Sequence, residues 1–151
     1  MKKVFCIGEL LIDFVGKNQG GNLSETIEFI KKAGGAPANV ACAIALLGGK
    51  SSFIGCVGED QFGKFLKSIL DKLKVDTSLL QYSKKFTTLA FVSLAKDGER
   101  DFVFNRGADR ELKYDVTLKE NFENNMLHFG AATSFLGGDL EETYSRYFSD
   151  A

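Results

Sequence analysis

The segment Gly34-Gly35-Ala36-Pro37-Ala38-Asn39 carries the residue types best suited to binding chemistry. Paired glycines let a ligand approach the backbone closely, and they expose N–H groups where a helix starts. Asn39, in the first turn of the predicted helix, can add a side-chain amide to the same pocket. The same glycines also suit a plain tight turn from a strand into a helix, and their chemistry alone favours neither interpretation.

An early carboxylate is the second candidate. Asp13 closes the run Gly8-Glu9-Leu10-Leu11-Ile12-Asp13, just past the first predicted strand. A carboxylate held there can accept two hydroxyl hydrogen bonds, which is the chemistry of polyol recognition. The position also suits an ordinary turn aspartate, and the residue alone favours that simpler interpretation.

Two phosphate-binding patterns fail on inspection. Gly49-Lys50-Ser51 is similar to the end of a nucleotide-binding P-loop, but Ile44 stands where the first glycine belongs, and the tripeptide follows a helix instead of preceding one. Gly8 is followed by Glu9, Leu10 and further apolar residues, so no Gly-x-Gly-x-x-Gly pattern follows the first strand. We therefore expect neither a P-loop nor a dinucleotide-binding module.

Strands and helices alternate along the first half of the chain. Apolar runs at 3–9 and 51–57 predict strands covered on both faces, as in a parallel sheet. Helices are predicted over 38–47, with Pro37 near its start, and over 61–73, capped by Asp60. The first helix is small and apolar all round, so we expect it to be buried on most sides. This order is typical of an α/β fold.

Strand-rich segments of another kind interrupt that order. The runs 86–95 and 100–106 are joined by Asp97-Gly98, the strongest short signal for an antiparallel hairpin. Residues 10–15 continue extended after the first strand, and 26–32 predict a half-exposed strand. A buried strand over 126–131 and a helix over 139–148 follow, and no linker or repeat divides the chain.

Composition narrows the possible partners. The 151 residues are 44% hydrophobic and carry a net charge of −1, so neither nucleic acid nor an anionic membrane surface is an expected partner. No apolar run reaches the roughly 20 residues of a membrane-spanning helix, and no leader is evident, which predicts a cytoplasmic protein. The cysteines are odd in number and flanked by apolar residues, which favours free thiols over disulfides or a zinc site, at Cys6, Cys42 and Cys56.

A longer pattern resembles the N-terminal signature of the ribokinase/PfkB carbohydrate kinases, namely Gly34-Gly35, Pro37, Asn39, Ala41, Gly48 and Gly58. The resemblance implies a ribokinase-like α/β fold over 1–151: a mostly parallel sheet flanked by helices, with a small β-sheet lid inserted at about 10–32 and 86–106. The run that ends at Asp13 is similar to the opening strand of that family, in which the aspartate that matches Asp13 binds sugar hydroxyls. The resemblance therefore favours Asp13 as a sugar ligand, beside Gly34, Gly35 and Asn39.

The segment 97–109 resembles the fructokinase branch in particular, as does Leu127-His128-Phe129-Gly130 followed by Gly137-Gly138. This implies that Phe104 stacks on the sugar and that Arg106 reaches a hydroxyl or screens phosphate charge. A packing role for Phe104 and a solvated strand end for Arg106 are the alternatives. His128 has no acidic or nucleophilic neighbour in sequence, and we expect it to be structural.

Phosphoryl transfer from ATP requires a base, an anion hole and a nucleotide site with Mg²⁺. In the family these come from a later Gly-Ala-Gly-Asp segment and its surroundings, which this sequence does not contain. Gly107-Ala108-Asp109 lacks the second glycine, so Asp109 is not a candidate base. We expect no catalytic or metal-binding residue in this chain, the C-terminal ATP-binding part to be absent, and the 151 residues alone to be inactive as a truncated, split or partial product.

The activity that the resemblance implies is transfer of the ATP γ-phosphoryl group to a primary hydroxyl of a sugar, with fructose as first choice. A kinase for 2-keto-3-deoxygluconate, ribose or a nucleoside is one alternative. A non-catalytic sugar-binding fragment, or a module that forms a homodimer through the edge strands of the lid, is the other.

Overall fold

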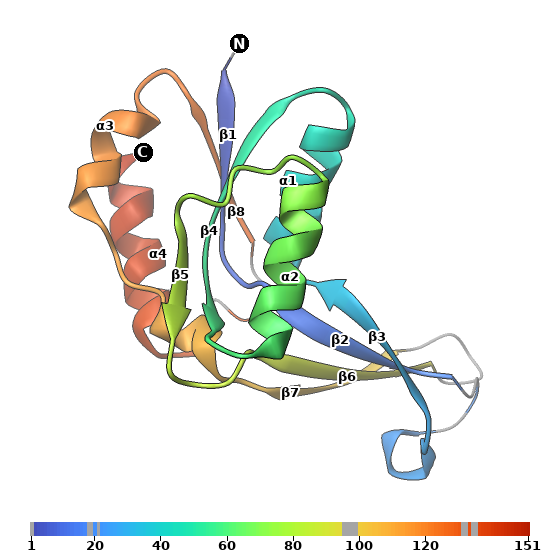
Figure 1. Cartoon of the computed structure of the whole chain (residues 1–151). Coiled ribbons are helices and arrows are strands. Elements are labelled where there is room, and N and C mark those ends of the chain that lie inside the picture. Colours follow the sequence, from blue (N-terminus) through green and yellow to red (C-terminus); the bar gives the residue numbers. More distant parts are fainter. Residues whose placement is uncertain (1, 18–19, 21, 95–99, 131–132, 134–135) are drawn as a thin grey trace.

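The structure, a computed structural model, describes residues 2–17, 20, 22–94, 100–130, 133 and 136–151 (Figure 1). Its strands form two four-stranded sheets, one in the order β5-β4-β1-β8 and the other in the order β3-β2-β6-β7. The second sheet extends from one end of the first (Figure 1).

The first sheet is parallel throughout and consists of β1 (Lys3–Ile7), β4 (Lys50–Gly58), β5 (Leu80–Ser83) and β8 (Met126–Phe129). Helices α1 (Ala36–Leu46) and α2 (Gln61–Lys72) lie on one side of it, and α3 (Lys119–Phe122) and α4 (Asp139–Asp150) on the other (Figure 1). The predicted α/β fold is confirmed. The short strand β5 was not predicted.

Each face of the first sheet supports its own hydrophobic core. Phe5 and Ile7 of β1 pack with the side chains of α3 and α4, whereas Cys6 between them packs with those of α1 and α2. Successive side chains of a strand point to opposite faces, so a strand that is apolar at every position must be covered twice. This explains the continuous apolar run of β1 and the continuous burial of β4 from Ser51 to Gly58.

Helix α2 begins at Gln61, as the sequence predicts, whereas α1 begins at Ala36, slightly before the predicted start at 38. The side chain of Asp60 accepts a hydrogen bond from the amide of Gly63, as an N-cap of α2 should. The expectation that α1 is buried on most sides is wrong: Ala38 and Ala41 are buried, but Leu46 is 69% exposed. The reason is that α1 packs on the sheet with one side only, since it forms the outer layer of the fold (Figure 1).

The second sheet consists of β2 (Leu11–Gly16), β3 (Phe29–Gly34), β6 (Leu89–Leu94) and β7 (Arg100–Asn105). Strand β2 pairs antiparallel with β3 and parallel with β6, and β6 pairs antiparallel with β7. The antiparallel pairing that Asp97-Gly98 predicted is present, although that dipeptide lies outside the described residues. Strand β3 begins at Phe29, later than the predicted start at 26, after a 3-10 turn over Leu23–Glu25 that Asn22 caps.

Two further 3-10 turns, Ala108–Glu111 and Val116–Leu118, connect β7 to α3. All three cysteines are free, as predicted, with Cys6 and Cys56 buried and Cys42 half-buried. None of the helices in the described part of the chain has both the length and the hydropathy needed to cross a bilayer.

Candidate functional site

The register of the second sheet places Asp13 and Phe104 in one row. Asp13 of β2 pairs with Lys32 of β3 and with Ala90 of β6, and Ala90 pairs with Phe104 of β7. Directly paired residues point their side chains to the same face of a sheet. Asp13 and Phe104 therefore share a face, two strands and roughly 10 Å apart at their backbones.

The carboxylate of Asp13 lies directly over Gly34. A Cβ atom added to Gly34 would stand 2.2 Å from Asp13 Oδ2 and 2.5 Å from Cγ, closer than any real contact. The absence of a side chain at position 34 therefore makes room for the Asp13 carboxylate. Burial raises the pKa of this carboxyl above its usual value, and the nearby charge of Lys32 partly offsets the shift.

Gly35 makes the tight turn into α1. Its φ of 112° is one that other residues rarely adopt, and an added Cβ would lie 2.3 Å from the backbone oxygen of Glu9. Close contact with the protein backbone is thus sufficient reason for a glycine here. The structure supplies the turn role that the sequence left open.

Glu9 is a buried carboxylate that sequence reasoning overlooked. It is 0% exposed, and its Oε1 accepts a hydrogen bond of 3.1 Å from the amide of Ala36, the first residue of α1. A negative group at a helix N-terminus interacts favourably with the helix dipole. The Ala36 amide is therefore already hydrogen-bonded within the protein. The only sequence signal for Glu9 was that it lies just past a buried strand.

Asn39 lies in the first turn of α1, where its amide N–H donates to the carbonyl of Gly35 at 2.9 Å. The residue is exposed, so its side chain is accessible at the end of α1 that adjoins the Gly34-Gly35 turn. Phe104 is half-buried, and its ring stacks on that of Phe102 at a centroid distance of 6.0 Å.

Arg106 is engaged with other protein groups. Its Nε and Nη2 lie 2.9 and 2.8 Å from Asp109 Oδ2, and its Nη1 donates to the carbonyls of Leu136 and Gly137. The side chain is 10% exposed. Arg106 is therefore neither a solvated strand end nor a freely available cation.

The P-loop look-alike has an ordinary structural role. Ser51 is buried in β4, and its hydroxyl donates to the carbonyl of Ala41 at 2.8 Å, while Gly49 N–H donates to Ile44. These residues bond to backbone carbonyls and do not fit a phosphate cradle. Within the described ranges, no three His, Cys, Asp or Glu side chains converge as metal ligands would.

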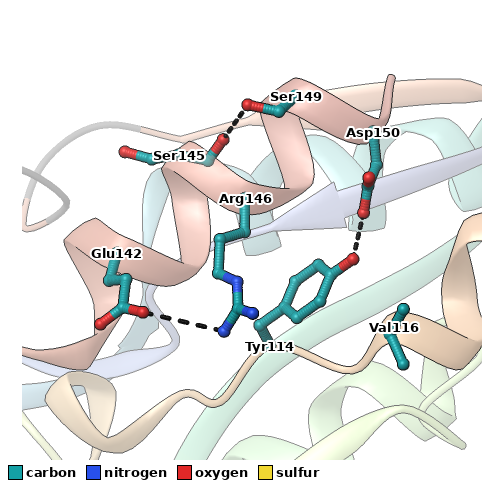
Figure 2. Close-up of a pocket in the computed structure, with 7 residues that line it drawn as sticks. All are labelled: Tyr114, Val116, Glu142, Ser145, Arg146, Ser149 and Asp150. Atoms are coloured by element: carbon teal, nitrogen blue, oxygen red, sulfur yellow. Dashed lines mark hydrogen bonds and ion pairs between the residues drawn. The ribbon is translucent and has the colours of Figure 1, made fainter.

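A surface depression of about 570 Å³ lies elsewhere, between α4 and the segment at 114–116 (Figure 2). The Cζ atom of Arg146 lies 4.5 Å from the centre of the Tyr114 ring, and its Nη1 lies 3.7 Å from Glu142 Oε1. The Tyr114 hydroxyl donates a hydrogen bond to Asp150. Its charged groups are thus engaged with protein partners, Arg146 with Glu142 and Asp150 with Tyr114 and Lys119. None of the site residues predicted from sequence lines this depression, so it is separate from the Asp13 row.

Comparison with known proteins bears on the fold that holds these residues. The model of a family described as "pfkB family carbohydrate kinase" matches residues 1–149. The chain is 46% identical over 132 residues to probable fructokinase-5 of Arabidopsis thaliana, an alignment that covers 85% of this chain and 41% of that protein.

Two solved structures have the same fold. A fructokinase from Halothermothrix orenii superposes with a TM-score of 0.88 at 28% identity, over 99% of this chain and 53% of that one. A fructokinase from Xylella fastidiosa with bound ATP gives 0.80 at 33% identity, over 99% and 48%. The chain thus spans about two fifths to one half of the length of these relatives.

Proposed function

Because the chain belongs to the pfkB family of carbohydrate kinases, we propose that it carries the sugar-binding part of a fructokinase-like enzyme. The reaction is transfer of the γ-phosphoryl group of ATP to a primary hydroxyl of a sugar. The single observation that carries the proposal is the contact between the Asp13 carboxylate and Gly34, at the turn into α1. It puts a hydroxyl acceptor beside the Gly34-Gly35 backbone, as the proposed pocket requires.

Asp13 accepts sugar hydroxyls in this proposal. A carboxylate accepts from two hydroxyl groups at once, and charge-assisted hydrogen bonds of this kind are about twice as strong as neutral ones. Half-burial of Asp13 strengthens its selectivity, since a ligand without matching hydroxyls would leave a desolvated carboxylate unpaired. Burial also raises the pKa of Asp13, which means that the ionised carboxylate is less favourable here than in water. Hydrogen bonds from the hydroxyls of the ligand offset this cost.

Gly34, Gly35 and Asn39 form the second side of the pocket. Gly34 leaves the backbone uncovered next to Asp13, and the exposed Asn39 adds an amide at the start of α1. Phe104 covers the pocket from the far strand, since its row on β7 is shared with Asp13. An aromatic ring there packs against the C–H face of a sugar and excludes water, which otherwise competes as phosphoryl acceptor.

The second sheet serves as the lid in this proposal, with its strands inserted at about 10–32 and 86–106. ATP with Mg²⁺ is the phosphoryl donor, in keeping with the ATP bound to a solved relative. The base and nucleotide site are assigned to a Gly-Ala-Gly-Asp segment, which is not among these 151 residues. We therefore expect this chain to bind sugar but not to phosphorylate it. Its free thiols suit a reducing compartment such as the cytoplasm.

Isothermal titration of the purified chain with D-fructose, 2-keto-3-deoxygluconate, ribose and a nucleoside tests the proposal. We expect fructose to bind most tightly, Asp13→Asn to abolish binding, and Asp101→Asn, an exposed position on β7, to leave it unchanged. Binding of every sugar with equal weakness, or binding that survives Asp13→Asn, would contradict the assignment. A coupled ATP-consumption assay on the same sample should show no turnover.

A homodimer formed through the second sheet is the further proposal for partners. Ile30 pairs with Val15, Val15 with Val92 and Val92 with Phe102, so Ile30 and Phe102 lie on the same face of the sheet as Asp13. Their side chains are 46% and 44% exposed. They sit on the two edge strands β3 and β7, where apolar side chains and unpaired backbone groups favour association. Sedimentation equilibrium should give a dimer that Phe102→Lys converts to a monomer, and a monomeric parent chain would refute it.

A further inference from the structure

Three buried polar side chains meet where β6 begins and β7 ends. Thr88 and Asp109 are each 1% exposed, and the Arg106 side chain is 10% exposed. They come from the segments that flank strands β6 and β7, and in the structure they form one hydrogen-bonded group. Buried polar groups of this kind are stabilising only when every member is satisfied.

Asp109 uses both of its carboxylate oxygens. Oδ2 faces Nε and Nη2 of Arg106 at 2.9 and 2.8 Å, and Oδ1 accepts a hydrogen bond from the Thr88 hydroxyl. The Thr88 hydroxyl oxygen in turn accepts from the amide of Gly107 at 2.9 Å. The carboxylate is therefore held from both ends, and it fixes the plane of the guanidinium opposite it.

The other end of the guanidinium reaches a distant segment. Arg106 Nη1 donates to the carbonyls of Leu136 at 3.0 Å and Gly137 at 3.2 Å, which lie 30 and 31 residues further along the chain. Gly137 and Gly138 have φ values of 77° and 90°, and Gly138 is the N-cap position of α4. Arg106 thus connects the end of β7 to the turn from which α4 starts.

Arg106 donates three hydrogen bonds to protein oxygens, one from Nε and two from Nη1, while Nη2 makes only the ion-pair contact with Asp109. A buried ion pair gains little net stability over apolar packing, so its contribution is the geometry it imposes. That geometry affects Phe104, because Phe104 is the penultimate residue of β7 and Arg106 directly follows the strand's last residue.

We propose that Asp109 is a positioning residue: it holds Arg106 so that the 136–138 turn is fastened to the end of β7, which sets the height of Phe104 over the sugar pocket. Asp109 acts through Arg106 and does not touch the sugar. The effect on sugar rests on the proposed function, whereas the fastening of the turn does not.

Hydrogen exchange of the sugar-free chain tests the fastening. In Asp109→Asn, we expect amide exchange in the peptide spanning 136–141 to accelerate by roughly tenfold, because hydrogen bonds to a charged buried group are lost. Asp101→Asn makes the same chemical change at an exposed position of β7 and should leave exchange unchanged. Equal exchange in Asp109→Asn and the parent chain would overturn the proposal.

A double-mutant cycle, with melting temperatures, separates loss of the Arg106–Asp109 interaction from general misfolding of a variant. Arg106→Gln should loosen the turn as Asp109→Asn does, and the double variant, a neutral pair, should loosen it no further. Additive effects would mean that the two side chains act independently, which contradicts the proposal. Melting temperatures of all four proteins identify any variant whose exchange reflects global unfolding.

Titration with D-fructose tests the effect on the pocket. Asp109→Asn should weaken binding on the order of tenfold, whereas Asp13→Asn should abolish it. If the parent chain binds no fructose, the proposed function and the positioning role both fail, and exchange still decides whether the pair fastens the turn. If Asp109→Asn loosens the turn but binds fructose as the parent does, the positioning role alone is overturned.

Discussion

The Asp13 carboxylate occupies the space that a side chain at Gly34 would need. Oδ2 lies 2.2 Å from where a Cβ at position 34 would stand, although Asp13 pairs in the sheet with Lys32 and not with Gly34. The carboxylate leans along the strand toward the turn into α1. This single relationship joins the two candidates that the sequence offered separately.

Gly34→Ala should therefore displace the carboxylate rather than unfold the chain. Gly34 lies in a regular strand, so alanine causes no backbone strain there, but its methyl group would clash with the Asp13 carboxylate. We expect fructose affinity, measured by calorimetry, to fall by at least about tenfold. Gly48→Ala is the matched control. Gly48 has a φ of 83° with open space around it, so this variant should lose about 1 kcal/mol of stability and no affinity. Equal affinity in Gly34→Ala and the parent would argue against the Asp13 pocket.

Sugar binding should weaken on acidification at a pH above the usual carboxyl range. Burial raises the pKa of Asp13 against the opposing charge of Lys32, and only the ionised carboxylate accepts two hydroxyl hydrogen bonds. Affinity should fall as pH drops through the raised pKa. Titrations from pH 7 to pH 4 measure this fall, and a flat profile would remove Asp13 from the site.

Asp13→Asn should also stabilise the sugar-free chain slightly. Because the folded pKa is raised, the folded state binds the proton more tightly, so the cost of ionisation is fully present above the folded pKa and disappears below the unfolded one. Thermal unfolding should show an Asp13→Asn advantage at pH 7 that shrinks towards pH 4 and vanishes below the unfolded pKa of about 3.9. A lower melting temperature for the variant at pH 7 would indicate a structural role for the carboxylate.

Asp60 connects α2 to the entry of the second sheet. Its Oδ1 accepts from Gly63 N and Thr87 Oγ1, both at 2.8 Å, and its Oδ2 accepts from Thr87 N at 2.7 Å. Asp60→Ala removes a helix cap and leaves buried donors of Thr87 unpaired, which should cost about 3 kcal/mol and lower the melting temperature by roughly 6–12 °C. Asp60→Ser retains the helix cap but not the hydrogen bonds to Thr87, so its melting temperature should lie between those of the parent chain and Asp60→Ala.

The contribution of Asp60 should depend on pH in a defined direction. Burial opposes ionisation of Asp60, but the hydrogen bonds from Gly63 and Thr87 prevail and lower its pKa. A carboxyl with a depressed folded pKa stabilises the fold above its unfolded pKa of about 3.9 and loses that effect as pH falls through the folded value. The gap between the parent and Asp60→Asn should therefore close on acidification, and a gap constant down to pH 2 would contradict this.

The three thiols should resist alkylation in the native state. Burial raises the pKa of Cys6 to about 12 and that of Cys56 to about 12, so almost no thiolate exists at pH 8. Cys42 is half-buried, and its pKa is also raised by burial. Iodoacetamide labelling followed by mass spectrometry should modify Cys42 first and the others only in denaturant. Rapid native labelling of Cys56 would show that the core around it opens.

The sequence by itself determined the features governed by local rules. Strand β1 and the start of α2 at Asp60 follow from an apolar run and a capping residue, and both lie where predicted. The family pattern anchored in Gly34-Gly35 and Asn39 likewise belongs to the sequence alone, and the match over residues 1–149 confirms it. The overestimated burial of α1 marks the limit of this reasoning, because composition does not say how many neighbours a helix has.

Only the tertiary structure decided which groups are already engaged. Glu9 binds the amide of Ala36, 27 residues away, and Arg106 turns to Asp109 and to the carbonyls of Leu136 and Gly137. These partners are set by strand register and by the packing of separate elements, and no local pattern encodes either. Buried charges must find partners wherever the fold brings them, so the structure, and not residue type, distinguishes a free ligand from a committed one.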